Sequence, residues 1–362
     1  MRKNLFATTP GIIIVGAVIG LIAVWLQKLG NPANMGICVA CFERDVAGGL
    51  GLHRAAIVQY LRPEIMGLVL GSLAAAIATR EFKPRGGSAP IVRFVLGMIA
   101  AMGALVFLGC PWRAILRLAG GDGNAILGLA GLATGIWFGT LFFKKGYSLG
   151  RSNSQSVVSG ALFPVIAVCL LLLYLIFPQI PDQPQSGPLF YSVKGPGSQH
   201  APFIASLGLA FIIGIFAQRS RFCTMGAFRD LFLFRYTHLF LGLAAMFAAA
   251  FIANALTGGL KFGFEGQPVA HSDFLWNYLG MVTAGLAFAL AGGCPGRQLF
   301  MAGEGDSDAG IFALGMLVGA AMAHNLGTAS SGTGIGVYGM QATIIGFRSE
   351  EHTSELQSRQ VI

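Results

Sequence analysis

The sequence predicts an all-α polytopic membrane protein with about nine transmembrane helices and an inverted internal repeat. Of its 362 residues, 54% are apolar and only 11% are charged, whereas roughly a quarter of a typical soluble domain is charged. Apolar runs of about 18 residues or more, the length that crosses about 30 Å of hydrocarbon, recur along the chain. Two short motifs also occur twice in the same order, which indicates internal duplication.

The two repeated motifs each contain a cysteine and an arginine. The first is Gly-Cys-Pro-x-Arg, at residues 109–113 and 293–297. In the second motif, a cysteine precedes an Arg-Asp pair by six residues. Its two copies are Cys38 with Arg44 and Asp45, and Cys223 with Arg229 and Asp230. The cysteines of the two motifs lie 72 residues apart in the first half and 71 apart in the second, so the halves are nearly in register.

Nine apolar stretches are long enough to span a membrane. We expect them near residues 11–28, 64–80, 91–109, 124–142, 157–177, 202–218, 237–256, 275–292 and 309–326. Shorter segments lie between them, near residues 36–50, 111–120, 221–235 and 294–304, and each carries one copy of a motif. These four are too short to span and too rich in Gly, Arg and Asp to face lipid, so we predict broken or re-entrant helical loops.

The order of motifs and spans predicts how the two halves are related. The first half is expected at residues 1–150 and the second at 201–347, with a linking helix and an extracytoplasmic loop at 151–200. The cysteine of the Arg-Asp motif follows the first span in one half and the sixth span in the other. Since odd and even spans end on opposite sides of the membrane, the repeats are inverted, an arrangement found in many transporters.

The formal net charge of +9 fits a membrane protein, because Lys and Arg concentrate in cytoplasmic loops. We therefore expect the lipid bilayer, and no nucleic acid, as the partner of these charges. Basic residues gather at the amino terminus and at 80–93, 144–151 and 219–235, whereas the loop at 178–202 has only Lys194. This predicts a cytoplasmic amino terminus. Three arginines on the opposite side argue against this orientation unless they line a pathway: Arg44, Arg54 and Arg62.

The Cys-Pro pairs predict thiols at the starts of short helices. Pro111 and Pro295 suit the first helical position, where no N–H donor is lost. The preceding thiol of Cys110 or Cys294 then lies where free N–H groups and the helix dipole favour an anion. A thiol is soft, polarisable and a weak donor, which suits an anion that carries sulfur or selenium. The nearby Arg113 and Arg297 either add positive charge or brace the broken helices.

Other candidate groups have simpler interpretations. Cys169 lies in an apolar run and is interpreted as a packing residue, and Cys41 has no counterpart, because Gly226 takes its place. Cys38-x-x-Cys41 is also the spacing of a metal or redox pair. The two Arg-Asp pairs either hold the broken segments by charge-assisted bonds or contact the anion. No metal-ligand spacing links the histidines, no ATP-binding motif is visible, and we predict no metal or cofactor.

These motifs together resemble the YeeE/YedE family of bacterial inner-membrane proteins, over nearly the whole chain to about Gly346. The resemblance implies thiosulfate uptake, an hourglass-shaped inverted-repeat fold and a multi-pass position in the bacterial inner membrane. It also implies Cys110 and Cys294 in a central pathway, Cys38 near one entrance, S–H···S contacts without covalent chemistry, and a cytoplasmic sulfurtransferase-like partner. The stretch from Arg221 to Asp230 is similar to the YedE branch, which is linked to selenium metabolism.

We therefore predict non-enzymatic transport of a small anionic sulfur or selenium species. The predicted substrate pathway consists of Cys38, Cys110, Cys223 and Cys294. Two alternatives stay open: a covalent relay that carries the chalcogen as a persulfide or selenosulfide, and a soft-metal transporter with thiolate ligands. Residues 348–362 turn abruptly polar and resemble a translated sequencing-adapter fragment, so we predict that they are not native.

Overall fold

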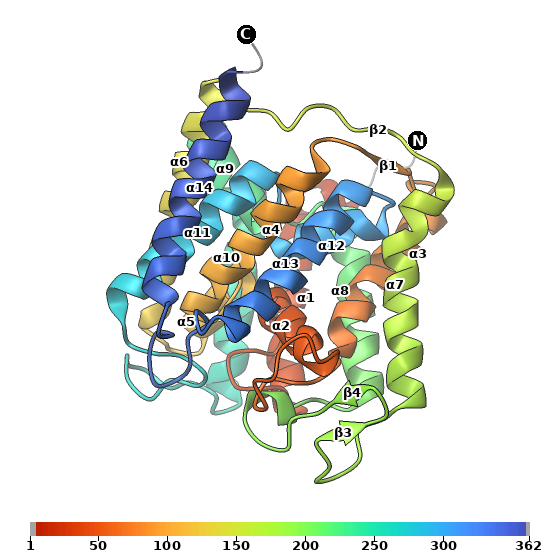
Figure 1. Cartoon of the computed structure of the whole chain (residues 1–362), viewed down its shortest axis with the longest axis vertical. Coiled ribbons are helices and arrows are strands. Elements are labelled where there is room, and N and C mark those ends of the chain that lie inside the picture. The colour runs from red at the N-terminus through yellow and green to blue at the C-terminus, as the bar shows by residue number, and fades with distance from the viewer. Residues whose placement is uncertain (1–4, 360–362) are drawn as a thin grey trace.

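The computed structural model describes residues 5–359, and the side chains to residue 350, as an almost wholly helical bundle (Figure 1). The long helices are α1 (Thr9–Lys28), α3 (Pro63–Ala78), α4 (Pro90–Phe107), α6 (Asn124–Lys144), α7 (Val157–Ile176), α8 (Phe203–Ser220), α10 (His238–Leu256), α11 (Phe274–Ala291), α13 (Ser307–Asn325) and α14 (Gly339–Arg359). The short ones are α2 (Val39–Gly49), α5 (Pro111–Ala119), α9 (Thr224–Phe234) and α12 (Pro295–Gly303). Minor elements are 3₁₀ turns η1 (Leu5–Ala7) and η2 (Pro196–Ser198) and the two-residue strand pairs β1 (Arg85–Gly86) with β2 (Asn153–Ser154) and β3 (Gln185–Ser186) with β4 (Leu189–Phe190).

The prediction of an all-α polytopic membrane protein is confirmed. Among the described residues, eight helices are long and apolar enough to cross a membrane, and the apolar α3 is slightly shorter. Each predicted span corresponds to one long helix, and each predicted broken segment to one short helix. At α5 and α12, Gly and Cys end an apolar run and Pro begins the new helix.

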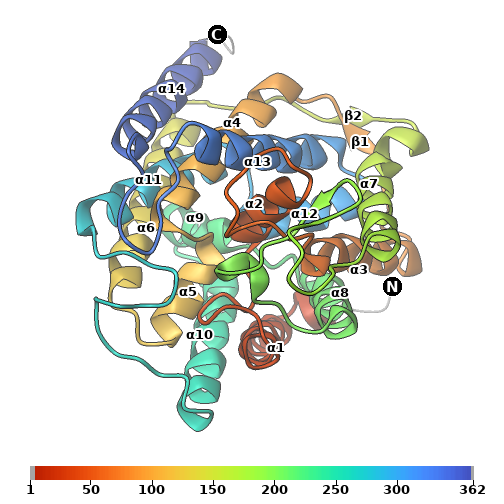
Figure 2. The ribbon, with the colours of Figure 1, turned by 60° about the horizontal axis from the view of Figure 1, so that its bottom comes forward.

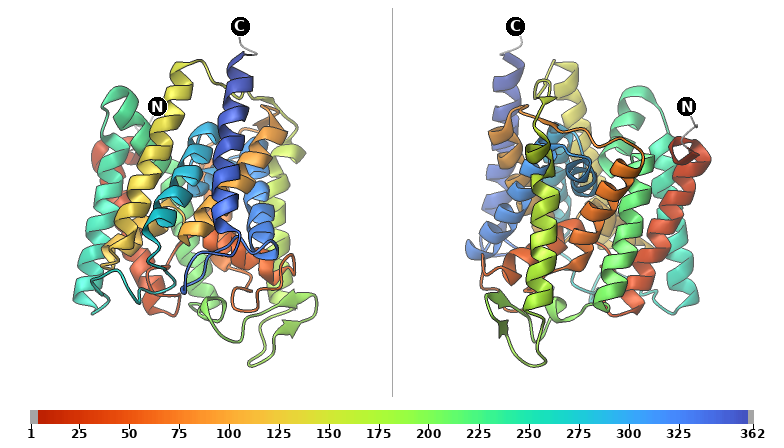
Figure 3. Two further views of the ribbon diagram at one scale, coloured as in Figure 1. Left: turned by 60° about the vertical axis from the view of Figure 1, so that its left-hand side comes forward. Right: turned by 90° about the vertical axis from the view of Figure 1, so that its right-hand side faces the viewer.

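The two halves interlock through equivalent helix pairs. Helix α1 packs along α10 as α8 packs along α3, and α6 packs along α11 as α13 packs along α4. Helices α1 and α8 run in opposite directions, since Phe6 before α1 contacts Phe216 near the end of α8. At the other end, the backbone N–H of Ala201, before α8, donates to Asn31 just after α1. The right-hand view of Figure 3 shows these helices side by side.

Equivalent loops also clasp the ends of α5 and α12. The N–H of Lys83 donates to the carbonyl of Glu304, and the N–H of Lys261 donates to that of Gly120. The next contacts repeat the pattern, from Arg85 to Gly305 and from Gly263 to Gly121. The duplication therefore extends from the cysteine motifs to the loops that hold the far ends of the broken helices.

Two parts of the chain differ from the expectations. Cys169 is exposed on α7. The interpretation of Cys169 as a residue packed inside the protein is therefore wrong. No helix was expected after residue 326, but α14 (Gly339–Arg359) packs against α4 and α11. The repeat boundaries at residues 150 and 201 stay predictions, as does the non-native origin of residues 348–362.

Gly16 provides a test of the close packing between the halves. A Cβ atom at Gly16 would lie 1.9 Å from the Gly242 carbonyl oxygen on α10, whereas one at Gly208 on α8 meets nothing within 4 Å. We expect Gly16→Ala to force α1 and α10 apart and to destabilise the protein by roughly 1–3 kcal/mol. The measurement is the midpoint of thermal unfolding of the purified protein in detergent. Gly208→Ala is the matched control, and equal midpoints for the two variants would contradict the packing argument.

Candidate thiol-lined site

The four predicted pathway cysteines share one structural position. Each is the N-cap residue of a short helix: Cys38 of α2, Cys110 of α5, Cys223 of α9 and Cys294 of α12. Pro111 and Pro295 follow as the first helical residues of α5 and α12. Every one of these thiols is therefore placed beside free N–H groups at a helix start, where the macrodipole supplies about half a positive charge.

The first half gathers three thiols. The Cys38 sulfur accepts hydrogen bonds from the backbone N–H of Cys41 at 3.4 Å and from that of Cys110 at 3.5 Å. Side-chain contacts also join the Cys38 thiol to those of Cys41 and Cys110. Cys41 thus belongs to the cluster, although its lack of a counterpart argued against a site role. The C-x-x-C spacing was the signal that pointed to it.

The second half gathers two thiols in the equivalent arrangement. The Cys223 sulfur accepts a hydrogen bond from the backbone N–H of Gly226 at 3.2 Å. The thiols of Cys223 and Cys294 contact each other, and the Cys294 backbone also contacts Cys223. Gly226 occupies the place of Cys41, so this half has a pair where the first half has a triad. We call the two groups the first and second thiol clusters.

Both clusters lie inside the bundle. Cys38 and Cys294 are wholly buried, and Cys110 and Cys223 expose at most 6% of their surface. Figure 2 shows α2 and α12 within a ring of longer helices. These cysteines are all free thiols. The geometry therefore presents soft thiols and helix amino ends in a buried interior, a combination that can hold an anion through its soft atom.

The two motif arginines differ in their partners. Arg113 is wholly buried and donates to the carbonyls of Asn34, Leu108, Pro268 and Val269 and, at 3.6 Å, to the Cys41 sulfur. No carboxylate among the described residues forms an ion pair with it. Arg297, in contrast, pairs with Glu304 at 3.1 Å. Gly120 occupies the position equivalent to Glu304, so Arg113 lacks the carboxylate partner that Arg297 shares with Arg85 and Arg221.

The two Arg-Asp pairs also differ. Asp45 is wholly buried between Arg44 and Arg62, each at 2.7 Å. Arg62 then donates to the carbonyls of Gln199 and Pro196, which ties α2 to the loop before α8. In the second half, Arg229 contacts Asp230 at 2.8 Å, but the arginine side chain is 36% exposed. The first pair is thus a structural brace, and sequence reasoning missed Arg62 as its third member.

The halves meet at Trp112. Its indole packs against Phe222, which precedes Cys223, and against Phe300 of α12. The position equivalent to Trp112 in the second motif is Gly296, and a Cβ there would lie 3.1 Å from the indole. A large side chain in one repeat therefore fills the space that a glycine leaves in the other, directly between the two clusters. Sequence reasoning did not select Trp112.

A basic cavity of about 440 Å³ opens at the carboxyl end of α11, immediately before the second cluster. It is lined by Arg93, Arg229 and the segment from Ala289 to Gly292. Arg93 donates to the carbonyl of Ala291 at 3.0 Å. Arg229, predicted as a supporting residue, thus lies where an anion would approach Cys294 from this side.

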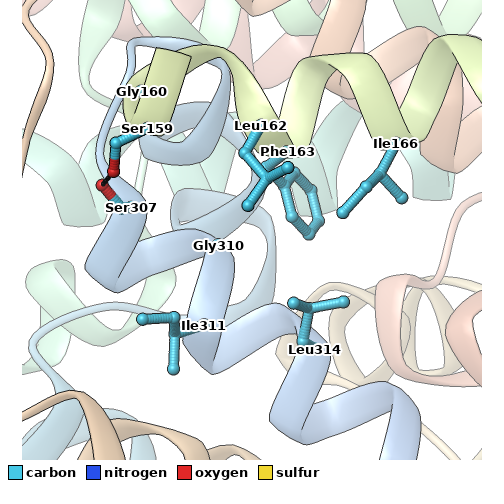
Figure 4. A pocket seen from close by; sticks show the side chains of 9 residues that line it. All are labelled: Ser159, Gly160, Leu162, Phe163, Ile166, Ser307, Gly310, Ile311 and Leu314. Atoms are coloured by element: carbon cyan, nitrogen blue, oxygen red, sulfur yellow. Dashed lines mark hydrogen bonds between the residues drawn. The ribbon is translucent and has the colours of Figure 1, made fainter. Parts of the chain in front are cut away.

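The remaining cavity and side-chain clusters do not suggest a second polar site. A cavity of about 150 Å³ between α7 and α13 is almost wholly apolar (Figure 4). Its polar side chains, Ser159 and Ser307, contact each other at 3.2 Å. Among residues 5–350, whose side chains the structure describes, no three His, Cys, Asp or Glu side chains converge as metal ligands would.

Parts of the chain are similar to known sulfur-transport proteins. Residues 219–340, which include the second thiol cluster, match the model of the Sulphur transport family. The chain is also 32% identical over 106 residues to the thiosulfate transporter TsuA of Spirochaeta thermophila, over 29% of this chain and 32% of that protein. The alignment spans about a third of the relative's length. With its paired cysteine motifs and its helical membrane fold, the chain is thus similar, over part of its length, to sulphur-transport proteins.

Proposed function

We propose that this protein moves a small sulfur-containing oxyanion such as thiosulfate across the membrane, along a pathway that passes both thiol clusters. The observation that carries the proposal is the pairing of thiols at converging helix amino ends. Such a site matches an anion that has one soft sulfur atom and a separate charged, oxygen-bearing group. The family match and the similarity to a thiosulfate transporter support this cargo class.

The residues suggest a sequence of contacts. On one side, Arg93 and Arg229 draw the anion into the basic cavity, since charged walls raise the local concentration of a counter-ion. The thiols of Cys223 and Cys294 then contact its sulfur by S–H···S hydrogen bonds. On the other side, the Cys38, Cys41 and Cys110 thiols do the same beside the unpaired charge of Arg113. No covalent bond forms, so the protein acts as a transporter and not as an enzyme.

The covalent relay is the alternative that the thiol pairing also permits. In that reaction a thiolate attacks the outer sulfur of thiosulfate, the S–S bond breaks with its electron pair on the leaving sulfite, and a persulfide remains on the cysteine. Mass spectrometry of protein incubated with thiosulfate separates the two proposals. We expect no cysteine peptide to gain a sulfur atom, whereas a persulfide on Cys294 or Cys110 during turnover would support the relay.

We further propose that the protein is an inner-membrane protein with a cytoplasmic amino terminus. Two of the arginines that count against this orientation, Arg44 and Arg62, are buried in the ion-paired brace. They are therefore not loop charges of the kind that set topology. A reporter fused after Lys145 is expected in the cytoplasm, and a periplasmic reporter there would contradict the orientation. A cytoplasmic sulfurtransferase-like protein would then consume the cargo.

Uptake in cells without their own carriers tests the cargo. We expect cells that produce the protein to accumulate labelled thiosulfate above cells with an empty vector. Labelled selenite is measured in parallel, because the stretch from Arg221 to Asp230 is similar to the selenium-linked branch. Selenite uptake without thiosulfate uptake would reassign the cargo. No uptake of either anion by protein present in the membrane would contradict both assignments.

A further inference from the structure

Two buried hydrogen-bond donors between the thiol clusters have no partner. The indole nitrogen Nε1 of Trp112 and the hydroxyl Oγ1 of Thr224 make no hydrogen bond within the described structure. Trp112 is 1% exposed and Thr224 is wholly buried. A buried donor without an acceptor destabilises the folded state, so native proteins keep such groups satisfied. An acceptor that arrives with the cargo would account for both.

The six-membered ring of the Trp112 indole faces the second cluster. Its Cζ2, Cε2 and Cη2 atoms are the atoms closest to Gly296, at 3.1, 3.4 and 3.5 Å from a Cβ built there. Since Nε1 is bonded to Cε2, the N–H group is one bond away from this contact. Gly296 is the second residue of α12, whose N-cap is Cys294. The unpaired indole N–H is therefore beside the free N–H groups at the start of this helix.

Thr224 is the second residue with an unpaired donor at this cluster. It is the first residue of α9 and follows the N-cap Cys223. Its backbone contacts the Cys294 thiol. The Thr224 residue is thus adjacent to both cysteines of the second cluster, and it belongs to a different helix from Trp112.

We propose that Trp112 and Thr224 bind the oxygen atoms of the anion while its sulfur contacts Cys223 and Cys294. This inference rests on the proposed function and extends it to the residues that select the cargo. Thiosulfate has a soft terminal sulfur and three oxygens that accept hydrogen bonds. The thiols fit the first feature, and the N–H and O–H donors fit the second. An anion without oxygens would leave both donors unpaired, so the two residues select for an oxyanion.

Kinetics of thiosulfate uptake by purified protein in proteoliposomes test the inference. We expect Trp112→Phe, which keeps the ring and removes the N–H, to raise KM at least tenfold, a change equivalent to about 1.4 kcal/mol. Thr224→Val should do the same, whereas Thr224→Ser, which keeps a hydroxyl, should remain near wild type. Trp137→Phe is the matched control, because Trp137 is 44% exposed on α6.

Tryptophan fluorescence provides a second test. It leaves Trp112 in place, so it does not depend on whether the Trp112→Phe protein folds. A protein in which Trp25, Trp137 and Trp276 are phenylalanine retains Trp112 as its tryptophan. We expect thiosulfate, but not chloride, to change its fluorescence. Unchanged fluorescence together with a wild-type KM for Trp112→Phe would overturn this inference. The proposed function would still stand in that case, provided that the wild-type protein takes up thiosulfate. Absence of wild-type uptake would overturn both.

Discussion

Replacing Cys110 or Cys294 by alanine is expected to reduce thiosulfate uptake more than tenfold at equal membrane abundance. Each substitution removes the N-cap thiol of a broken helix and with it a soft contact to the anion. Neither thiol forms an N-cap hydrogen bond to the helix that it precedes. The two helices should therefore persist in the alanine variants. Uptake of labelled thiosulfate by whole cells is the measurement.

The chain provides its own control for this prediction. Cys169 is exposed on α7, away from both clusters, and Cys169→Ala should leave uptake unchanged. Equal loss in Cys169→Ala would point to a general effect of cysteine removal. Full uptake by both Cys110→Ala and Cys294→Ala would contradict a pathway through the thiols.

Asp45→Ala is expected to cause the largest loss of stability. It leaves the buried guanidinium groups of Arg44 and Arg62 without their shared carboxylate, and removing one partner of a buried ion pair costs about 3–5 kcal/mol. Asp230→Ala removes the equivalent carboxylate in the second half, where Arg229 is partly exposed. Such exposed pairs contribute only about 0–1 kcal/mol.

Thermal unfolding of the two aspartate variants in detergent measures this difference. A large drop in the unfolding midpoint for Asp45→Ala and a small one for Asp230→Ala are expected. If both variants unfolded at the same temperature, the buried ion pairs of Asp45 would not stabilise the protein more than the partly exposed pair of Asp230, and the prediction would be wrong.

The positions of the breaks could be predicted from the sequence because local chemistry sets them. Gly-Cys-Pro ends an apolar run and begins a helix wherever it occurs, so the starts of α5 and α12 were expected from the motif alone. The contacts of Cys38 with Cys110, and of Cys223 with Cys294, were not predicted. The equal spacing of the motifs indicated a duplication, and the resemblance placed Cys38 near an entrance and Cys110 in the central pathway.

Contacts between the halves could not be predicted, because they depend on how the repeats interlock. Trp112 and Gly296 occupy the same position in one motif, and only the fold shows that they face each other. Two ion pairs within single halves were also not predicted: Arg62 with Asp45, 17 residues away, and Arg297 with Glu304. These residues make the two clusters chemically different despite their common motif.

Exchange of radiolabelled thiosulfate across proteoliposomes that contain only the purified protein tests the central claim most directly. Vesicles loaded with unlabelled thiosulfate should accumulate external label with the wild-type protein, and Cys294→Ala should reduce the initial rate more than tenfold. Sulfate inside the vesicles should support less exchange, because it has no terminal sulfur for the thiols. A wild-type rate equal to that of empty vesicles, or equal exchange by Cys294→Ala, would contradict a thiol-lined path for this anion.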